Sequence, residues 1–445
     1  MAPTGLRLTV FGAGYLGATH AACMAELGHD VLGVDIDPSK LAKLQSGTVP
    51  FYEPGLEEVL QRNIARGRLR FTASYEEAGA WGNVHFLAVG TPQKKGEFAA
   101  DITALESVVD SLAPLLTEQA VIFGKSTVPV GTAARLRVRA RNLAPAGDDV
   151  EVAWNPEFLR EGFAVQDTLH PDRLVLGVDS GSAGRAQAVA RKVYAALLQE
   201  KIPFLVMDLA TAELVKTAAN AFLATKISFI NAVSDVCAAS GADVTVLADA
   251  IGHDPRIGRR FLNAGIGFGG GCLPKDIRAF MARAGELGVG QSLAILREVD
   301  SINVGRRAAV VELAREAVGG SLLDVKIAVL GTAFKPNSDD VRDSPSLDVA
   351  GQMQLHGAAV SVYDPEAMDN SRRLFPTLNY TTSAIEACAD ADAVMVLTEW
   401  PEFREMSPGL LAAYVRAKVM IDGRNCLDPA VWRGAGWTYR GLGRP

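Results

Sequence analysis

The stretch with the greatest chemical potential is a glycine-rich run that ends in a thiol, GIGFGGGCLPKD at residues 265–276. A glycine backbone approaches ligands closely and adopts positive φ, and this one leads directly to Cys272. Pro274 suits a first helical turn, so we expect Cys272 at or just before a helix N-terminus, with Lys275 and Asp276 in that turn. Both the helix N-terminus and the ammonium favour the nucleophilic thiolate. The stretch predicts a reactive thiol beside a ligand; a flexible loop with an inert cysteine is the alternative.

A second glycine cluster predicts a dinucleotide-binding site near the N-terminus. An apolar run ends at Phe11 and is followed by GAGYLG, a helical pattern as far as Leu27, and a further apolar run that ends in Asp35. Small residues let a pyrophosphate lie on a helix N-terminus, and the acid accepts hydrogen bonds from the ribose. Asp35 disfavours a 2′-phosphate, so we expect NAD rather than NADP, although Lys40 is near. The cofactor residues predicted in this region are Gly12, Gly14, Tyr15, Leu16, Gly17, Asp35 and Lys40.

Hydroxyl side chains follow two later apolar runs. Residues 84–89 lead into Gly-Thr-Pro, and residues 120–123 lead into GKSTVP. In an open parallel sheet ligands bind beyond the carboxyl ends of the strands, so we expect Thr91, Ser126 and Thr127 to line the cofactor site. Ordinary turn hydroxyls are the alternative.

Two acids lie four positions apart in NPEFLREG at residues 155–162. Asn155 followed by proline has the pattern of a helix start, which would place Glu157 and Glu161 on one face of the helix that follows. Beside a cofactor these acids are candidates for proton transfer; a solvated helix face is the alternative.

A long apolar helix is expected over residues 210–239, where Lys216 and Asn220 lie one turn apart and share a face. Its length and its position between two α/β halves favour a connector that also forms the core of a dimer. Lys216 on this helix is either functional or a surface lysine whose stem covers apolar neighbours.

The strand pattern restarts at residues 326–330 and recurs at 359–363 and 393–397, which predicts a second α/β unit. This unit lacks GxGxxG, so it is expected to bind the nucleotide end of a substrate rather than a second dinucleotide. Possible anchors are Lys335, Arg342 and Arg424, each weighed against a surface salt bridge. Arg256 lies in DPRIGRR, which suits phosphates or a charged surface loop.

The length, net charge and cysteine content of the chain argue against several classes of function. The chain has 445 residues, a net charge of −7 and five widely spaced cysteines. The negative charge argues against nucleic acid and anionic membranes as partners, and the cysteine pattern favours neither a disulfide framework nor a metal site. We identify no leader peptide and no run of membrane-spanning length, so a cytoplasmic protein is expected.

A nicotinamide site combined with a nucleophilic thiol predicts more than an alcohol dehydrogenase. A cysteine can trap an aldehyde as a thiohemiacetal, release a second hydride to NAD, and leave a thioester that water hydrolyses to an acid. Such a site needs a base, hydrogen-bond donors for the oxyanion, and residues that bind the remote end of the substrate.

The motifs GAGYLG, KSTVPVG, NPEFLREG, GFGGGCLPKD, GTAFKPN and IDGR, together with the Lys216/Asn220 helix, occur in this order along nearly the whole chain. In this the sequence resembles the UDP-glucose/GDP-mannose dehydrogenase family. The resemblance implies an N-terminal NAD-binding Rossmann domain at 1–203, a central helical dimerisation domain at 204–318, and a C-terminal Rossmann-like UDP-binding domain at 319–445. It also implies a homodimer.

The resemblance further implies catalytic roles by position. Cys272 would be the thioester nucleophile, and Lys216 and Asn220 would stabilise oxyanions. Asp276 with Thr127 would position or activate water, and Glu157 resembles the acid/base residue of the family.

Cofactor and substrate contacts are implied in the same way. Besides the fingerprint, the implied cofactor contacts are Asp35, Lys40, Thr91, Ser126, Glu161, Lys275 and Arg342. The implied substrate contacts are Glu157, Phe158, Leu159, Lys216, Asn220, Arg256 from the partner subunit, Asn263 where some relatives carry lysine, Gly267, Phe268, Gly269, Phe334, Lys335 and Arg424.

The reaction predicted from the resemblance is the oxidation of UDP-glucose to UDP-glucuronate with two NAD reduced per sugar. GDP-mannose and UDP-N-acetylmannosamine are the alternative substrates. A sensor that binds NAD and a nucleotide sugar without turnover is the alternative of another class, and a two-electron 2-hydroxy-acid dehydrogenase would leave Cys272 without a role.

Overall fold

The computed structural model describes residues 5–179 and 184–445, which form two compact units. The first contains Met1–Ala219 and Arg278–Leu287, and the second contains Asn220–Ile277 and Gly288–Pro445. Two helices, α10 (Leu209–Ser240) and α12 (Leu273–Glu286), contribute residues to both units. The expected α/β class is confirmed, and the three domain boundaries stay a prediction.

An eight-stranded sheet lies at the centre of the first unit, in the order β3-β2-β1-β4-β5-β6-β7-β8. The strand order reverses its direction between β1 and β4. This reversal is the topological switch point at which open α/β sheets bind ligands. Neighbouring strands are parallel except β6 and β7, which pair antiparallel through Trp154 and Gly177. The strands are β1 (Arg7–Phe11), β2 (Asp30–Val34), β3 (Leu69–Thr72), β4 (Val84–Leu87), β5 (Ala120–Gly124), β6 (Val150–Trp154), β7 (Leu174–Val178) and β8 (Phe204–Asp208).

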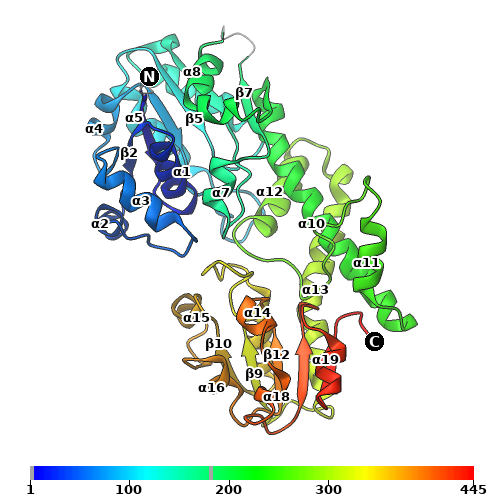
Figure 1. The fold of residues 1–445 in the computed structure, drawn as a ribbon. Coiled ribbons are helices and arrows are strands. Elements are labelled where there is room, and N and C mark those ends of the chain that lie inside the picture. The colour runs from blue at the N-terminus through cyan, green and yellow to red at the C-terminus, as the bar shows by residue number, and fades with distance from the viewer. Residues whose placement is uncertain (1–4, 180–183) are drawn as a thin grey trace. The chain divides into compact units, whose positions relative to one another are not determined.

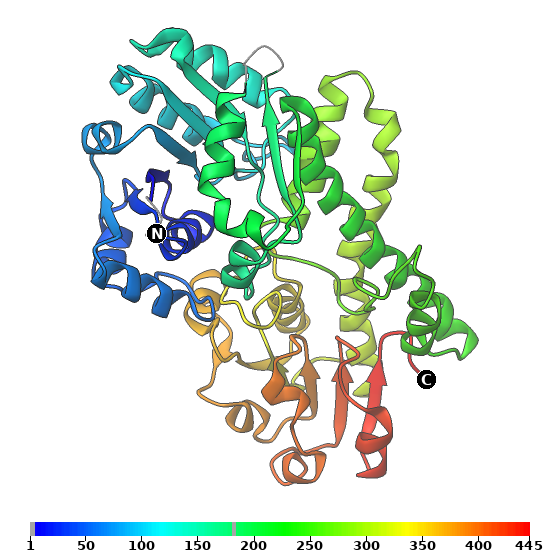
Figure 2. The same ribbon diagram turned by 45° about the horizontal axis from the view of Figure 1, so that its top comes forward.

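Helices cover both faces of this sheet, and each face has its own apolar core (Figures 1 and 2). Leu8 and Val10 of β1 belong to one core and Phe11 belongs to the other, because successive side chains of a strand point to opposite faces. The helical elements here are α1 (Tyr15–Glu26), α2 (Pro38–Gln45), α3 (Leu56–Ala65), α4 (Tyr75–Trp81), α5 (Thr103–Leu112), η1 (Ala113–Leu115), α6 (Thr132–Leu143), η2 (Gly147–Asp149), α7 (Ala164–Leu169), α8 (Arg185–Val193) and α9 (Ala195–Gln199).

Helix α10 confirms the long helix expected from the sequence and has 32 residues. By length and composition alone it could cross a membrane, so the expectation that no stretch has this property is wrong. Such a composition also suits a core helix of a soluble protein, and 39% of its most apolar window is buried. Glu213 and Lys216 are buried on this helix, so its first two turns contact other parts of the protein.

The second unit contains the predicted restart of the α/β pattern as a six-stranded sheet in the order β11-β10-β9-β12-β13-β14. Its neighbouring strands are all parallel, and its switch point lies between β9 and β12. The strands are β9 (Lys326–Leu330), β10 (Ala359–Tyr363), β11 (Asn379–Tyr380), β12 (Ala393–Val396), β13 (Val419–Asp422) and β14 (Thr438–Gly441).

A small apolar core joins α10 to the chain just before the glycine-rich run. Ile230 and Cys237 of α10 pack in one cluster with Val244, Leu262 and Ala264. Because Leu262 and Ala264 lie just before Gly265 in the chain, this cluster fixes the start of the glycine-rich run to α10. The remaining helical elements are α11 (Val244–Gly252), η3 (Gly290–Leu293), α13 (Ala294–Ala317), α14 (Pro345–Leu355), α15 (Met368–Leu374), α16 (Ala384–Cys388), α17 (Pro401–Arg404), α18 (Pro408–Leu411) and α19 (Pro429–Gly434).

Candidate active site

The turn between β1 and α1 has the geometry of a dinucleotide-binding loop. Gly12 has a φ of +90°, and a Cβ atom there would lie 2.9 Å from Val89, so the position requires glycine. A Cβ atom on Gly17 would lie 1.6 Å from the Gly12 carbonyl oxygen, because α1 packs tightly on the turn. Among the described residues no atom lies within 4 Å of the corresponding position on Gly14, which leaves room for a pyrophosphate at the N-terminus of α1.

Asp35 follows β2 and lies beside this turn. Its Oδ2 accepts a 2.7 Å hydrogen bond from the Ala13 N–H, and its Oδ1 accepts a 2.9 Å bond from the Asp37 N–H. Lys40 Nζ lies 3.9 Å from Asp35 Oδ2. The carboxylate is therefore held at the strand end, where an acid accepts hydrogen bonds from the ribose of NAD.

The hydroxyl residues after β4 and β5 lie together, as the parallel sheet requires. Thr91 Oγ1 donates a 2.7 Å hydrogen bond to the Thr127 carbonyl oxygen, and Ser126 Oγ donates a 2.7 Å bond to the Val89 carbonyl oxygen. Both hydroxyls thus tie neighbouring loops together. Their contact with a cofactor stays a prediction.

The loop after β5 is also tied to helix α10 by Glu213. The two carboxylate oxygens accept hydrogen bonds of 2.7 and 2.6 Å from the N–H groups of Gly131 and Ala133. Burial raises the pKa of Glu213 to about 7, although these hydrogen bonds oppose the change. Glu213 therefore fixes the loop that carries Thr127 to the helix that carries Lys216.

The segment after β6 differs from its predicted form. Residues 155–163 contain no helix, and α7 begins only at Ala164. Asn155 does not cap a helix, because its Nδ2 donates a 2.7 Å hydrogen bond to the Val175 carbonyl oxygen. The predicted helix start is wrong, and so is the shared helical face of the two glutamates. Buried tertiary hydrogen bonds outweigh the capping preference here.

Since β7 runs antiparallel to β6, the segment that connects these two strands stays at the carboxyl edge of the sheet.

Lys125 is a buried residue that sequence reasoning missed. Its Nζ donates a 3.0 Å hydrogen bond to Asn155 Oδ1, which also accepts a 2.5 Å bond from the Tyr194 hydroxyl. Burial lowers the pKa of Lys125 to about 8; the charge of Glu157 opposes this effect and that of Lys216 adds to it. A lysine placed directly after a buried strand was the signal that could have identified it.

Glu157 and Lys216 form a buried ion pair in the first unit. Lys216 Nζ lies 3.0 Å from Glu157 Oε1, and their side chains are 6% and 13% exposed. The ammonium also lies 5.5 Å from the centroid of the Phe158 ring. The Leu159 N–H donates a 2.7 Å hydrogen bond to Glu157 Oε2. The structure thus brings the predicted acid/base residue and the predicted oxyanion donor together, and Lys216 is not a surface lysine.

In the second unit, buried polar side chains of α10 and α13 hold the glycine-rich run. Asn231 Oδ1 accepts a 2.9 Å hydrogen bond from the Gly265 N–H, and Arg306 Nε donates a 3.1 Å bond to the Gly265 carbonyl oxygen. Asn303 accepts from the Phe268 N–H at 2.7 Å and donates to its carbonyl oxygen at 3.0 Å. Gly267 has a φ of +94°, and a Cβ atom there would lie 2.5 Å from Asn303 Oδ1. These three side chains were also missed; their signal was polar residues on otherwise apolar helices.

Cys272 directly precedes α12, as predicted, and its side chain is exposed. Its carbonyl oxygen accepts the Asp276 N–H at 3.0 Å. The Asp276 side chain is 1% exposed; it accepts a 2.6 Å hydrogen bond from Asn220 Nδ2 and pairs with Lys275 Nζ at 2.5 Å. The second unit therefore places a thiol at a helix N-terminus, one turn before a buried carboxylate that two predicted site residues contact.

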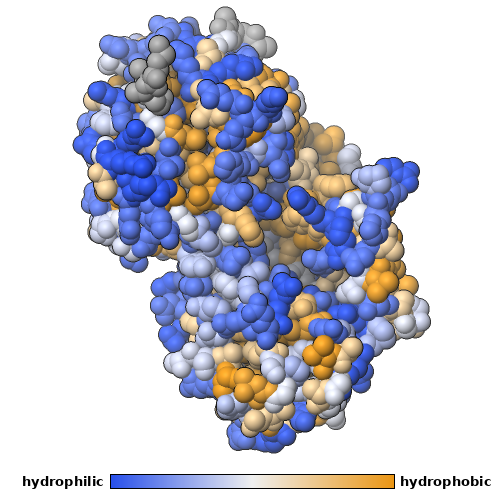
Figure 3. All heavy atoms as spheres, viewed as in Figure 1, coloured by the Kyte–Doolittle hydropathy of each residue, from blue (hydrophilic) through white to orange (hydrophobic). Residues whose placement is uncertain are grey.

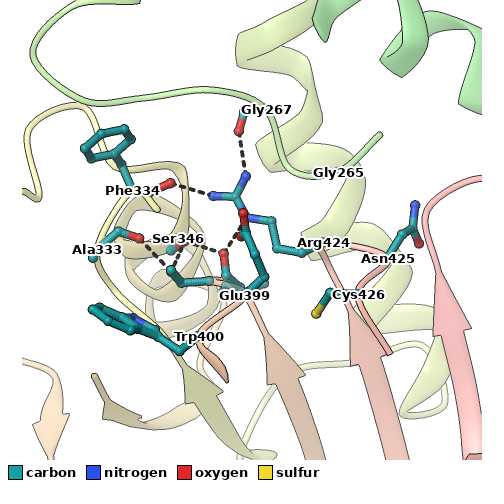
Figure 4. Close-up of polar contacts among 12 residues, drawn as sticks. Gly265, Gly267, Ala333, Phe334, Ser346, Glu399, Trp400, Arg424, Asn425 and Cys426 are labelled. Atoms are coloured by element: carbon teal, nitrogen blue, oxygen red, sulfur yellow. Dashed lines mark hydrogen bonds and ion pairs between the residues drawn. The ribbon is translucent and has the colours of Figure 1, made fainter. Parts of the chain in front are cut away.

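Arg424 follows β13 and joins three loops of the second unit (Figure 4). Its guanidinium donates to the carbonyl oxygens of Gly267 at 3.0 Å, Phe334 at 2.9 Å and Leu397 at 2.8 Å. Arg424 Nε also lies 3.4 Å from Glu399. These bonds hold the glycine-rich run to the carboxyl edge of the second sheet, whereas a contact of Arg424 with substrate stays a prediction.

The other predicted residues of the second unit divide into two groups. Phe334, Lys335 and Arg342 lie near the glycine-rich run: a Cβ atom on Gly270 would lie 2.8 Å from the Phe334 ring, and the Gly270 N–H donates to the Arg342 carbonyl oxygen at 2.8 Å. Lys335 Nζ lies 5.3 Å from the centroid of the Phe334 ring.

Arg256 and Asn263 lie in the surface segment before the run. The Arg256 side chain is 88% exposed and pairs with Asp254 at 2.6 Å. Asn263 Oδ1 accepts a 2.7 Å bond from Arg259.

In the first unit, the predicted cofactor contact Glu161 is buried. Within residues 5–179 and 184–445, no group of three metal-ligating side chains occurs.

The fold and these two sets of side chains define a nicotinamide-dependent dehydrogenase. The sheet order, the glycine turn at its switch point and Asp35 form a dinucleotide site, and the second unit supplies an exposed thiol. The glycine turn and Asp35 would hold the pyrophosphate and a ribose of NAD, and the cofactor would supply a hydride acceptor.

The chain belongs to the UDP-glucose/GDP-mannose dehydrogenase family. The model of the family's NAD-binding domain matches residues 6–198, that of its central domain matches residues 210–304, and that of its UDP-binding domain matches residues 328–429. The chain therefore binds NAD through its N-terminal domain and carries a UDP-binding domain at its C-terminal end.

Individual relatives match over their full length. The chain is 42% identical to the UDP-glucose 6-dehydrogenase of Rhizobium meliloti, over 99% of this chain and 100% of the relative. The structure of a UDP-glucose dehydrogenase from Pyrobaculum islandicum matches with a TM-score of 0.90 and 38% identity, covering 100% of this chain and 99% of that one. A UDP-D-ManNAc dehydrogenase from Pyrococcus horikoshii matches with a TM-score of 0.86 and 28% identity, covering 99% of both chains.

Proposed function

We propose that the protein oxidises UDP-glucose to UDP-glucuronate and reduces two NAD per sugar. The observation that carries this proposal is the exposed Cys272 at the N-terminus of α12 in an NAD-binding chain. A dehydrogenase that stopped at the aldehyde would have no use for a nucleophilic thiol. The relatives named for UDP-glucose are more similar to this chain than the one named for UDP-D-ManNAc, which favours UDP-glucose as the substrate.

In the first oxidation, the C6 hydroxyl loses its proton to a base and its carbon loses a hydride to NAD, which leaves an aldehyde. Glu157 and Lys216 are the candidates for proton transfer, because they share one buried ion pair. The ammonium of Lys216 is suited to stabilise an alkoxide, and Glu157 is suited to accept the proton directly or through water.

In the second oxidation, the Cys272 thiolate adds to the aldehyde carbon and forms a thiohemiacetal. Loss of a hydride to a second NAD converts this adduct into a thioester. Water then attacks the thioester carbonyl, the carbon–sulfur bond breaks, and the products are a carboxylate and the regenerated thiol.

Hydrolysis requires a positioned water and support for the tetrahedral oxyanion. Asp276 is the candidate for orienting or activating the water, together with Thr127. Asn220, which donates to Asp276, is the candidate for an oxyanion donor with Lys216. Lys275 neutralises part of the charge on Asp276, which lowers the free-energy cost of burying this carboxylate.

Substrate binding is assigned to both ends of the nucleotide sugar. The glycine-rich run offers backbone groups to the sugar, and Phe334 and Arg424 lie at the edge of the sheet in the UDP-binding domain (Figure 4). Lys335 follows Phe334 in the chain, and its Nζ lies near the Phe334 ring. The further proposed substrate contacts are Phe158, Leu159, Asn263, Gly267, Phe268, Gly269 and Arg256 of the partner subunit.

A homodimer formed through α10 is part of the proposal. Phe222, Phe229 and Val236 recur every seven residues on this helix and are 66%, 55% and 67% exposed. Figure 3 shows hydrophobic side chains at the surface in the region of α10 and α11. A repeat of large apolar residues on one exposed face favours packing against another helix. We further propose a cytoplasmic location, without nucleic acid or membrane as a partner.

The substrate assignment is tested by initial rates of NADH formation with UDP-glucose, GDP-mannose and UDP-N-acetylmannosamine. We expect kcat/KM for UDP-glucose to exceed the others at least about a hundredfold, because unpaired polar groups in a pocket built for one sugar are costly. Preference for another sugar would move the assignment within the family. Binding of UDP-glucose and NAD without any turnover would favour the sensor.

A further inference from the structure

A buried carboxylate outside the assigned site lies in residues 51–55, FYEPG, between α2 and α3. Glu53 is 6% exposed, and its Oε1 accepts a 2.7 Å hydrogen bond from the Ala164 N–H. Its Oε2 accepts a 2.6 Å bond from the Gly162 N–H and a further bond from the Tyr15 hydroxyl. Glu53 therefore joins three segments of the first unit that are distant in sequence.

Two of these segments carry residues assigned to ligands. Tyr15 is the first residue of α1 and lies within the GAGYLG turn, and its hydroxyl also accepts a 3.0 Å hydrogen bond from the Gly162 N–H. Its ring lies 4.9 Å from the ring of Phe51, which fixes the side chain against the FYEPG segment. The cofactor turn and Gly162, which directly follows the segment 157–161, thus share one buried network.

The segment 157–161 lies between two anchors. At its start, Asn155 is bound by Lys125 and Tyr194, in hydrogen bonds that do not involve Glu53. At its end, Gly162 and Ala164 are bound by Glu53. Between the anchors lie Glu157, whose carboxylate contacts Lys216, and Phe158. A shift of the second anchor therefore moves residues assigned to substrate.

We propose that Glu53 is a positioning residue that couples occupancy of the dinucleotide turn to the placement of the substrate-binding segment 157–161. The inference rests on the proposed function, because that function assigns Tyr15 to the cofactor and Glu157 and Phe158 to the sugar nucleotide. Binding of the dinucleotide orders the start of α1, and the network transmits this order to Gly162 and Ala164. The two ligands consequently bind with positive cooperativity.

The competing explanation is a purely structural cap of α7. A carboxylate that only satisfies two buried N–H groups would lower stability when removed, but it would not link two ligands. Glu151 offers a matched control for this explanation. Its carboxylate is also buried and accepts a 3.0 Å hydrogen bond from the Ala186 N–H at the start of α8, yet it lies on β6 at the end opposite Asn155.

The experiment compares the wild type, Glu53→Gln, Tyr15→Phe and Glu151→Gln in the intact protein. The Kd of UDP-glucose is measured by calorimetry with and without saturating NADH, which permits no forward turnover. We expect NADH to tighten UDP-glucose binding by about fivefold or more in the wild type and in Glu151→Gln. In Glu53→Gln this factor should approach one, because an amide cannot accept at all three positions, and Tyr15→Phe should give an intermediate factor.

Two results would overturn the inference. One is an equal coupling factor in the wild type and in both Glu53→Gln and Tyr15→Phe; the other is a wild type without coupling. Tyr15→Phe removes one hydroxyl only and provides the test if Glu53→Gln does not fold. If another nucleotide sugar is the substrate, the same factor is measured with that sugar, so failure of the substrate assignment is distinguished from failure of the coupling.

Discussion

At the level of single residues, the proposed nucleophile and the residues proposed to support it differ in their burial. Cys272 is exposed, whereas Asp276 and Asn220 are buried and bonded to each other. In the proposed mechanism, exposure permits the thiol to attack a ligand, and burial would hold the carboxylate in one orientation toward a water. The sequence predicted the helix start at Cys272 because the glycines and Pro274 act locally. It could not predict the Asn220–Asp276 bond, which joins residues 56 positions apart.

Replacement of Cys272 by serine is expected to stop the reaction after the first oxidation. A serine hydroxyl is far less ionised than a thiol, so the aldehyde is not converted into a thioester. UDP-glucuronate formation should fall about a thousandfold or more, while a two-electron product or a bound intermediate accumulates. The measurement is product analysis by mass spectrometry after a single turnover. Full acid formation by Cys272→Ser would refute the thioester mechanism.

At the level of elements, the carboxyl edge of the first sheet depends on buried polar groups. Lys125 follows β5 and binds the segment after β6 through Asn155. This is also where sequence reasoning failed, since an Asn-Pro pair predicts a helix start when its side chain is free to cap. The strands β1, β2, β4 and β9 were predictable because each is a buried apolar run. The antiparallel direction of β7 was not predictable, because it depends on pairing with a strand that is distant in the sequence.

Replacement of Lys125 by methionine is expected to reduce activity without reducing stability at pH 7. Burial lowers the pKa of Lys125 from its usual 10.5 to about 8, which corresponds to about 3 kcal/mol of cost for the charged form. The unfolded chain binds more protons between pH 8 and 10.5, so the wild type gains stability as pH rises through this window. Methionine carries no such cost, whereas loss of the bond to Asn155 should lower kcat about tenfold or more.

The measurement for Lys125→Met is the free energy of unfolding in urea from pH 7 to 10.5, relative to the wild type. The advantage of the variant should be greatest below pH 8 and disappear toward pH 10.5. Lys226→Met is the control for the loss of an ammonium that donates to carbonyl oxygens, because Lys226 also donates to two of them but is less buried than Lys125. A difference that stays constant with pH would contradict the account.

At the level of the whole molecule, two α/β units with different ligands follow from two sequence patterns. The GAGYLG turn marks the NAD-binding unit, and the later restart without this turn marks the unit that contains the UDP-binding domain. Family motifs predicted this division and the order of the domains. The exposed repeat of Phe222, Phe229 and Val236 was not visible as a repeat in the sequence, because α10 is apolar on several faces.

Replacement of Phe229 by glutamate is expected to weaken the proposed dimer. A charge on the exposed apolar face of α10 would be desolvated in a helix–helix interface, so the dimer Kd should rise about thirtyfold or more. Sedimentation equilibrium measures this constant. Leu355→Glu is the control, because Leu355 is 87% exposed on α14 and its replacement should leave the mass unchanged. A monomeric wild type, or equal effects of the two changes, would contradict the dimer.

The most direct test of the central claim is the stoichiometry of the complete reaction. A limiting amount of UDP-glucose is incubated with excess NAD, and NADH is followed by absorbance until it stops rising. The account predicts two NADH per UDP-glucose, because Cys272 carries the aldehyde into a second oxidation. One NADH per sugar would contradict it, since the enzyme would then end at the aldehyde and the thiol would have no part in the reaction.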